Sequence, residues 1–176
     1  TMSDISARPV SPEAYEGPYA TIMLRNLPNN YSRSMLLKLI DSEGFAGEYD
    51  FIYLPMDFKS HASLGYAFVN LVSAEQAQRF FATFEGFSRW VVPSQKVCSV
   101  NWSHPYQGLE AHIERYRNSP VMHEDVPDDY KPMVFQNGKR IPFPEPTKKL
   151  KVPRMRPGHD KASLQEAVQD EEQAMG

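Results

Sequence analysis

The sequence has a single cysteine among its 176 residues, Cys98. One thiol excludes an intramolecular disulfide framework and a zinc site built from several cysteines, so a reducing compartment is expected. No apolar run approaches the roughly 18 residues that a membrane-spanning helix requires. The net charge is only −3 at pH 7, so the chain as a whole has no basic signature that would indicate a polyanionic partner.

Patterns typical of catalysis and metal binding are also missing. No two histidines are paired at metal-ligand spacing among His61, His104, His112, His123 and His159. There is no nucleophile elbow and no glycine-rich loop that could hold a phosphate. We therefore expect a binding module and not an enzyme, with no catalytic residue, no cofactor and no metal site.

Strand and helix patterns alternate through the first part of the chain. Strands are expected at residues 19–27, 49–57, 64–71 and 95–102, which are rich in aromatic and β-branched residues. Helices are expected at 33–42 and 74–84, with Ser32 and Ser73 as N-caps. The order β-α-β-β-α-β predicts an α+β, ferredoxin-like split βαβ fold, in which both helices cover one face of an antiparallel sheet.

Changes in composition divide the chain into four regions. Residues 1–18 contain three prolines and are expected to form a flexible leader. Residues 19–104 contain the β-α-β-β-α-β pattern, and residues 105–144 are expected to form an extension packed on it. Residues 145–176 are expected to be a disordered tail, first basic and then acidic.

Two patterns define the expected extension. Residues 107–119 place Leu109, Ile113 and Tyr116 on one stripe and charges elsewhere, which predicts an amphipathic third helix. Residues 131–143 carry Asn-Gly between two apolar runs, which predicts a β-hairpin.

Residues 64–71, LGYAFVNL, place two aromatic rings at alternate positions of a strand. Alternate side chains share a face, so Tyr66 and Phe68 are expected on the side of the sheet that the two helices leave uncovered. The run GYAFV also fits the octamer of an RNA recognition motif, although leucines stand at its basic first and aromatic last positions. The companion hexamer, IMLRNL at 22–27, has Met23 where an aromatic residue is usual.

This pattern predicts a surface for single-stranded RNA. Unstacked bases can lie on aromatic rings held at a fixed spacing, and each such contact contributes roughly 1–3 kcal/mol. Arginine, serine and asparagine side chains on the same face offer contacts to phosphates and base edges. The predicted RNA-binding residues are Met23, Arg25, Phe51, Tyr53, Tyr66, Phe68, Asn70, Ser99 and Asn101.

Three alternatives stay open. The third helix could fold back over Tyr66 and Phe68 in the free protein. A one-residue register shift would turn Phe51 and Tyr53 inward. Finally, the chain could be a protein-binding module with an RNA-recognition-like fold, but its octamer rings are intact and the loop FSRWVV lacks the Arg-x-Phe pattern of such modules.

Basic charge is concentrated near the C-terminus. Residues 19–118 have nine Lys or Arg and nine Asp or Glu, whereas residues 148–161 have six basic residues against one acid. Non-specific attraction to phosphates is therefore expected mainly from this tail, which could equally be a solvated segment or a nuclear-import signal. The third helix and the tail are also candidate surfaces for protein partners.

A longer stretch, including YDFIYLPMDF and QGLEAHIERYRNSPVMHED, resembles the C-terminal RNA recognition motif of the Mei-two-like family over residues 20–136. The resemblance implies sequence-selective binding of single-stranded RNA in post-transcriptional control, including meiosis. It implies a nuclear or cytoplasmic protein, or one found in both compartments. It also implies further recognition motifs upstream, and because Thr1 precedes Met2 we expect a piece of a longer chain.

Overall fold

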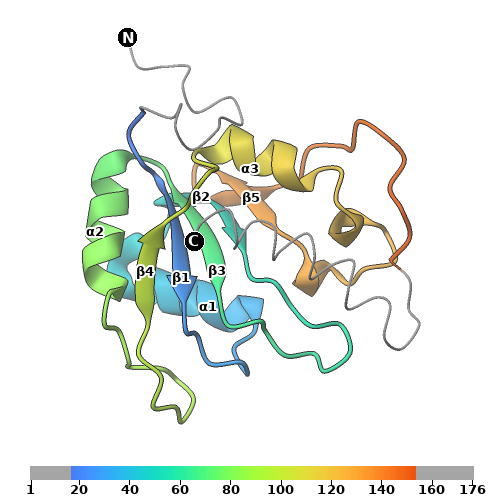
Figure 1. The fold of residues 1–176 in the computed structure, drawn as a ribbon. Coiled ribbons are helices and arrows are strands. Elements are labelled where there is room, and N and C mark those ends of the chain that lie inside the picture. Colours follow the sequence, from blue (N-terminus) through green and yellow to red (C-terminus); the bar gives the residue numbers. More distant parts are fainter. Residues whose placement is uncertain (1–16, 154–176) are drawn as a thin grey trace.

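The computed structural model describes residues 17–153. Its strands form one antiparallel sheet in the order β4-β1-β3-β2-β5-β6 (Figure 1). The strands are β1 (Thr21–Arg25), β2 (Tyr49–Tyr53), β3 (Ala67–Leu71), β4 (Ser99–Trp102), β5 (Met133–Gln136) and β6 (Lys139–Ile141). The helices are α1 (Arg33–Ile40), the π-helical turn η2 (Asp41–Phe45), α2 (Ala74–Phe84), α3 (Leu109–Tyr116) and the 3-10 turns η3 (Pro120–Met122) and η4 (Asp128–Tyr130).

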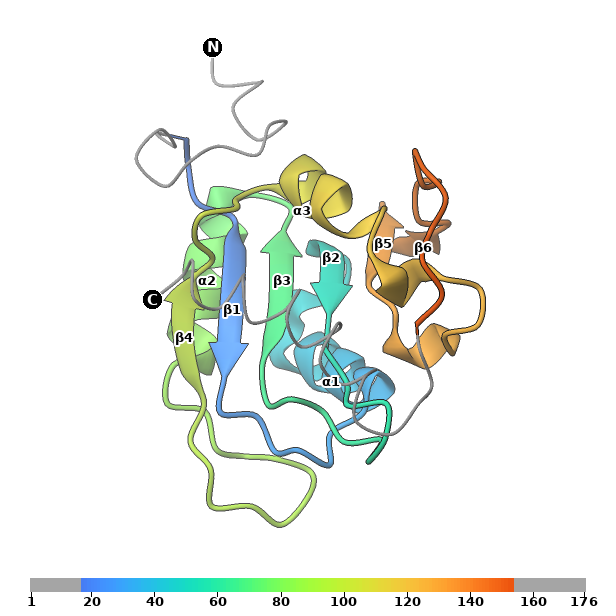
Figure 2. The same cartoon turned by 45° about the vertical axis from the view of Figure 1, so that its right-hand side comes forward.

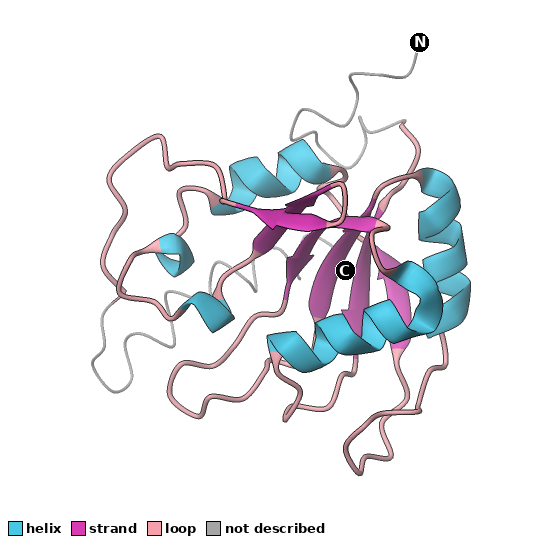
Figure 3. Cartoon of the chain, turned by 180° about the vertical axis from the view of Figure 1, so that it is seen from behind, coloured by secondary structure: helices cyan, strands magenta, loops and turns pink. Residues whose placement is uncertain are grey.

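Helices α1 and α2 cover one face of the sheet (Figure 3). Both begin at the predicted caps, because the Ser32 hydroxyl accepts the amide of Met35 and the Ser73 hydroxyl accepts that of Gln76. Their apolar sides pack on the strands to form the main core, and Phe80 is fully buried there. The predicted β-α-β-β-α-β order and the α+β class are therefore confirmed.

Strand β3 starts at Ala67, three residues later than predicted. Gly65 has φ +88°, a left-handed conformation that is not extended and that favours glycine. Its carbonyl accepts the amide of Leu27 at 2.8 Å, which ties the start of the octamer to the end of β1. The octamer glycine is thus a turn residue that leads into the strand.

Strand β2 contains a bulge that moves its aromatic residues to different faces. The register with β3 shifts between Tyr49 and Phe51. Consequently Tyr49 belongs to the main core, whereas Phe51 and Tyr53 belong to a second cluster on the opposite face. The prediction that Phe51 and Tyr53 lie on the face opposite α1 and α2 is correct. The bulge places Tyr49 on the other face, although simple alternation would put all three residues on the same one.

The predicted hairpin forms and extends the sheet. Strands β5 and β6 are connected at Asn137 and Gly138, both with positive φ, as an Asn-Gly turn requires. Strand β5 pairs with β2 through Phe51 and Val134. The hairpin therefore covers the edge of β2 and makes a six-stranded sheet, which the hairpin signal alone did not predict.

The expected leader and tail lie mostly outside the described residues, since residues 1–16 and 154–176 are not among them. The expectation of disorder from residue 145 onward is wrong at its start. The carbonyl of Glu145 accepts two hydrogen bonds from Arg117, and Thr147 is hydrogen-bonded to Asn118. Sequence composition did not reveal these contacts because their partners lie 28 and 29 residues upstream.

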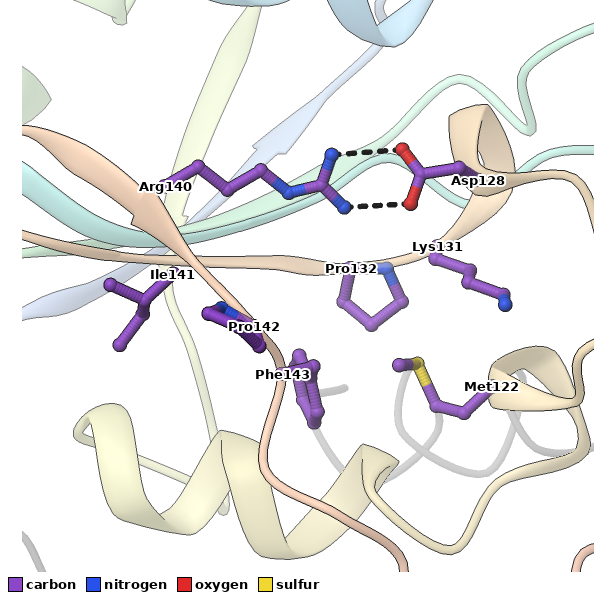
Figure 4. Close-up of a pocket in the computed structure, with 8 residues that line it drawn as sticks. All are labelled: Met122, Asp128, Lys131, Pro132, Arg140, Ile141, Pro142 and Phe143. Carbon is purple, nitrogen blue, oxygen red and sulfur yellow. Dashed lines mark hydrogen bonds and ion pairs between the residues drawn. The ribbon is translucent and has the colours of Figure 1, made fainter.

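A buried arginine fixes the segment before β5 to α1. The Arg33 guanidinium donates to the carbonyls of Asp128 and Lys131, and its Nη2 lies 2.8 Å from Oδ2 of Asp128. Arg140 of β6 forms a bidentate pair with the same carboxylate at 2.8 Å (Figure 4). The hydrogen bonds from Arg140 and then Arg33 hold the pKa of Asp128 well below its usual range.

We predict that Arg33→Ala lowers the free energy of unfolding by about 2–4 kcal/mol, because several charge-assisted hydrogen bonds of a buried side chain are lost and two partly buried carbonyls lose their donor. The matched control is Arg89→Ala. Arg89 pairs with Glu43 but its side chain is 76% exposed, so a loss of at most about 1 kcal/mol is expected. Urea denaturation at pH 7 measures both values, and equal losses would contradict the prediction.

Candidate nucleic-acid interface

Eight of the nine predicted site residues lie on neighbouring strands, and Tyr66 directly precedes β3. Met23 and Tyr53 are both cross-strand partners of Phe68, and Phe51 is the partner of Asn70. On the other side of β1, Met23 pairs with Asn101 and Arg25 with Ser99. The rings of Tyr66 and Phe68 meet edge to face with centroids 5.9 Å apart. The structure therefore brings the predicted residues together.

The predicted exposure of this face is wrong for six of the nine residues. Those with less than 9% of their surface exposed are Met23, Phe51, Tyr53, Tyr66, Phe68 and Asn70. The face opposite α1 and α2 carries α3, which crosses it near the end of β3 (Figure 2). The alternative in which the third helix folds back onto the sheet is thus the one that the structure contains.

Aromatic contacts hold α3 on the sheet. The ring of Tyr116 stacks on Phe51 with centroids 5.9 Å apart and an interplanar angle of 20°, and it meets Tyr53 at 4.8 Å. The ring of His112 lies 5.2 Å from Phe51 and 6.1 Å from Phe68. These side chains belong to the apolar stripe of the helix, so docking buries ring surfaces of both partners. This aromatic cluster also includes Met23, Tyr66, Ile113 and Val134.

His112 is a site residue that sequence reasoning missed. Its side chain is fully buried, and Nδ1 lies 3.0 Å from the carbonyl oxygen of Gly108. Burial lowers the pKa of His112 to about 4, so the ring is neutral at physiological pH. Its position in the sequence could have indicated it, because helical spacing places residue 112 on the predicted apolar stripe, between Leu109 and Tyr116.

A chain of hydrogen bonds links the sheet to the start of α3. Asn70 Nδ2 donates to Oδ1 of Asp50 at 2.7 Å, and the Thr21 hydroxyl donates to Oδ1 of Asn70 at 2.5 Å. The backbone amide of Gly108 then donates to Thr21 Oγ1 at 2.8 Å. Asn70, which we predicted to contact base edges, is therefore occupied by contacts inside the protein.

Gln107 reinforces this attachment. Its side-chain oxygen accepts the amides of Ala20 and Thr21, and its side-chain nitrogen donates to the carbonyls of Thr21 and Ser103. The buried amide thus adds side-chain hydrogen bonds to the backbone pairing at the start of β1. No sequence pattern indicated Gln107, because two of its three partners, Ala20 and Thr21, lie more than 80 residues away along the chain.

The network includes a perturbed carboxyl group. Burial raises the pKa of Asp50 from about 3.8 to about 6, and the nearby charge of Glu110 on α3 adds to the effect. The hydrogen bond from Asn70 opposes this shift. The charge of Asp50 therefore depends on pH just below neutrality, next to the point where α3 meets the sheet.

Three predicted residues keep access to solvent. Asn101 is exposed, while Arg25 and Ser99 are half-buried. They lie on β1 and β4, beyond the ring contacts that α3 makes with β2 and β3. Asn101 and Ser99 offer hydrogen-bond donors and acceptors, and Arg25 is suited to phosphate contacts or stacking on a base.

Two kinds of feature are absent from residues 17–153. Within that range, no three His, Cys, Asp or Glu side chains are grouped as metal ligands. None of the helices there is both long and apolar enough to cross a bilayer.

Comparisons with known proteins identify relatives of this chain. The profile of the RNA recognition motif 2 family matches residues 19–117. MEI2-like 4 of Oryza sativa subsp. japonica is 38% identical over 156 residues, which cover 85% of this chain and 15% of that protein. Terminal ear1 of Zea mays is 36% identical over 143 residues, covering 72% of this chain and 21% of that protein. The Rna15 motif solved with bound RNA (GU) aligns with 56% of this chain and 98% of its own at 16% identity and a TM-score of 0.45.

An antiparallel sheet with two helices on one face, and with octamer rings gathered on the other, is the architecture of an RNA recognition motif. The chain belongs to the RNA recognition motif 2 family, and its curated relatives are MEI2-like and terminal ear1 proteins. It is therefore a binding motif and not an enzyme. The chain spans only 15% and 21% of the length of those two relatives.

We predict that Asp50→Asn changes how stability depends on pH. A carboxyl group whose pKa rises on folding contributes stability that is fully present below about pH 4 and is lost as the pH rises through about 6. Because asparagine can still accept from Asn70, the variant should gain stability over the wild type across this range, reaching about 3 kcal/mol at pH 8.

Urea titrations of both proteins between pH 4 and pH 8 measure this difference. The low pKa of His112 acts in the opposite direction, since its contribution is present above about pH 6.5 and is lost as the pH falls through about 4. Because both proteins contain His112, this effect cancels in the difference between their stabilities. Glu124→Gln, which removes an exposed acid, is the control. A difference that shrinks with rising pH would refute the assignment.

Proposed function

We propose that the chain binds single-stranded RNA sequence-selectively, by stacking bases on the aromatic cluster when α3 moves off the sheet. One observation carries this proposal: the octamer rings, Tyr66 and Phe68, form one cluster with Met23, Phe51 and Tyr53 on the face of the sheet opposite α1 and α2. Membership in the RNA recognition motif 2 family supports it. Rings in this arrangement can each accept an unstacked base.

The docked helix sets a threshold for binding. If only a fraction of the molecules has α3 displaced, the apparent dissociation constant equals the intrinsic one divided by that fraction. The cost is partly offset, because a base that stacks on Phe51 or Phe68 replaces the ring of Tyr116 or His112 with another flat ring. RNA binding then exchanges one set of stacking partners for another.

Polar residues beside the cluster supply the proposed selectivity. Asn101, Ser99 and Arg25 flank Met23 on β1 and β4 and are accessible while α3 is docked. Asn70 joins them once the Thr21 and Gly108 contacts open. Hydrogen bonds from such groups discriminate between base edges, whereas stacking alone tolerates every base.

We place this activity in post-transcriptional control, in the nucleus, the cytoplasm or both, and in meiosis or development. This placement rests on the resemblance to the Mei-two-like family, whose name the MEI2-like relatives share. Single-stranded RNA is the proposed partner.

The burial of the octamer rings favours one alternative function, protein recognition through an RNA-recognition-like fold. In that case α3 would stay on the sheet permanently, and its outer side, which carries the exposed Glu110 and Glu114, would face the partner. The two hypotheses predict different changes in RNA affinity when the docking of α3 is weakened.

We predict that Phe68→Leu weakens RNA binding at least tenfold. Leucine keeps apolar contact with α3, so the cost in stability should stay below about 1.5 kcal/mol, but it removes the flat platform that a base requires. The control is Phe80→Leu, which changes an equally buried ring on α2 in the main core. Fluorescence anisotropy with labelled random-sequence 12-nucleotide RNA measures the affinities, and equal affinities of both variants would refute stacking on Phe68.

We also predict that Ile113→Ala tightens RNA binding up to tenfold. This residue is 6% exposed within the aromatic cluster, so truncation weakens docking and increases the fraction of molecules with α3 displaced. Gln136→Ala, which removes an exposed amide on β5, should leave the affinity unchanged. Unchanged or weaker binding by Ile113→Ala in the same anisotropy assay would favour the protein-binding alternative.

A further inference from the structure

The chain after β6 returns to the C-terminal end of α3. Residues 142–147, here called the strap, follow directly on β6 (Figure 1). Arg117 donates from Nε and Nη2 to the carbonyl of Glu145 at 3.0 and 2.7 Å. Asn118 and Thr147 form a reciprocal pair, in which Nδ2 donates to Oγ1 at 2.8 Å and Oδ1 accepts the Thr147 amide at 2.9 Å. The strap thus holds the residues that immediately follow the helix.

The strap has little other support along its path. Phe143 packs against the aromatic cluster, but a hollow of about 450 Å³ lies beside it, lined by Met122, Pro132 and Pro142 among others (Figure 4). Residues 144–147 are half-buried or exposed. The contacts with Arg117 and Asn118 are therefore a large part of what keeps the strap in place.

The two ends of α3 are attached by different parts of the chain. Its start is held at the beginning of β1, by the hydrogen bond from Gly108 to Thr21 and by those that Gln107 makes with Ala20 and Thr21. Between Gln107 and the helix stands Gly108, with φ +95° and ψ 159°, a conformation that glycine alone adopts readily. The far end carries Tyr116, which covers Phe51 and Tyr53, and this is the end that the strap holds.

We propose that the strap is a clasp that sets how often α3 leaves the sheet. With the clasp closed, α3 is held at both ends and the aromatic cluster stays covered. With it open, the Tyr116 end of the helix loses the strap contacts and is held mainly by its ring contacts, so it moves away from the sheet more often. The consequence for RNA rests on the proposed function, whereas the coupling between strap and helix does not.

Hydrogen exchange of the α3 amides measures this coupling directly. A helix of eight residues is not stable in water by itself, so α3 loses its hydrogen bonds when it undocks and its amides exchange. In the full chain, Asn118→Ala removes both contacts with Thr147, and we expect amides 112–117 to exchange about tenfold faster. Thr147→Val removes only the hydroxyl acceptor, for which about threefold is expected.

The matched control is Thr147→Ser, which retains the hydroxyl and should exchange like the wild type. A second control, Gln136→Ala, removes an exposed amide on β5. Amides of β3 should be unchanged in all variants, which separates local undocking from global unfolding. Phe143→Ala opens the clasp from its apolar side and should also speed exchange at 112–117. Exchange within twofold of the wild type in both Asn118→Ala and Phe143→Ala would overturn the clasp.

RNA affinity, measured on the same variants with the random-sequence 12-nucleotide RNA, separates the clasp from the proposed function. Faster α3 exchange with tighter RNA binding supports both. Faster exchange with unchanged RNA affinity supports the clasp and overturns RNA binding on the cluster. Unchanged exchange overturns the clasp, whatever the RNA affinity does.

Discussion

The contact between the rings of α3 and those of β2 and β3 determines what this motif can do. A sheet with helices on one side has a second face, and here that face carries large aromatic side chains that are costly to leave in water. Tyr116 and His112 cover Phe51 and Phe68. These contacts within the same molecule take the rings out of water. Any other flat, apolar partner must compete with this intramolecular contact.

Polar groups beneath α3 make the covered state specific. Asp50, Asn70, Thr21 and the Gly108 amide form one continuous chain of hydrogen bonds, and such a chain is worth most where water is excluded. It fixes the start of the helix at one position on the sheet, which ring contacts alone would not do. The raised pKa of Asp50 is the cost of placing a carboxyl group in that setting.

The sequence predicted the local features of the site and missed the non-local ones. Alternation along β1 and β3 placed Met23 and Phe68 on one face, because residue parity in a strand is fixed by backbone geometry. The stripe of α3 showed that the helix has an apolar side, but a stripe does not say which surface it covers. The bulge at Tyr49 and the pairing of Asn118 with Thr147 depend on three-dimensional contacts that no local pattern encodes.

If RNA binds by displacing α3, as we propose, the covering helix also changes which RNA is bound. Phosphate attraction acts on every sequence alike, and it makes no contact with the rings of Phe51 and Phe68 that α3 covers. Only a segment whose bases stack on those rings and hydrogen-bond to nearby side chains recovers the free energy lost when Tyr116 and His112 leave. In the proposed function the docked helix lowers the affinity of every complex that uses these rings by the same factor, so complexes held by stacking alone become too weak to form before those that add hydrogen bonds. Occlusion of the aromatic face thus favours selectivity at the expense of affinity.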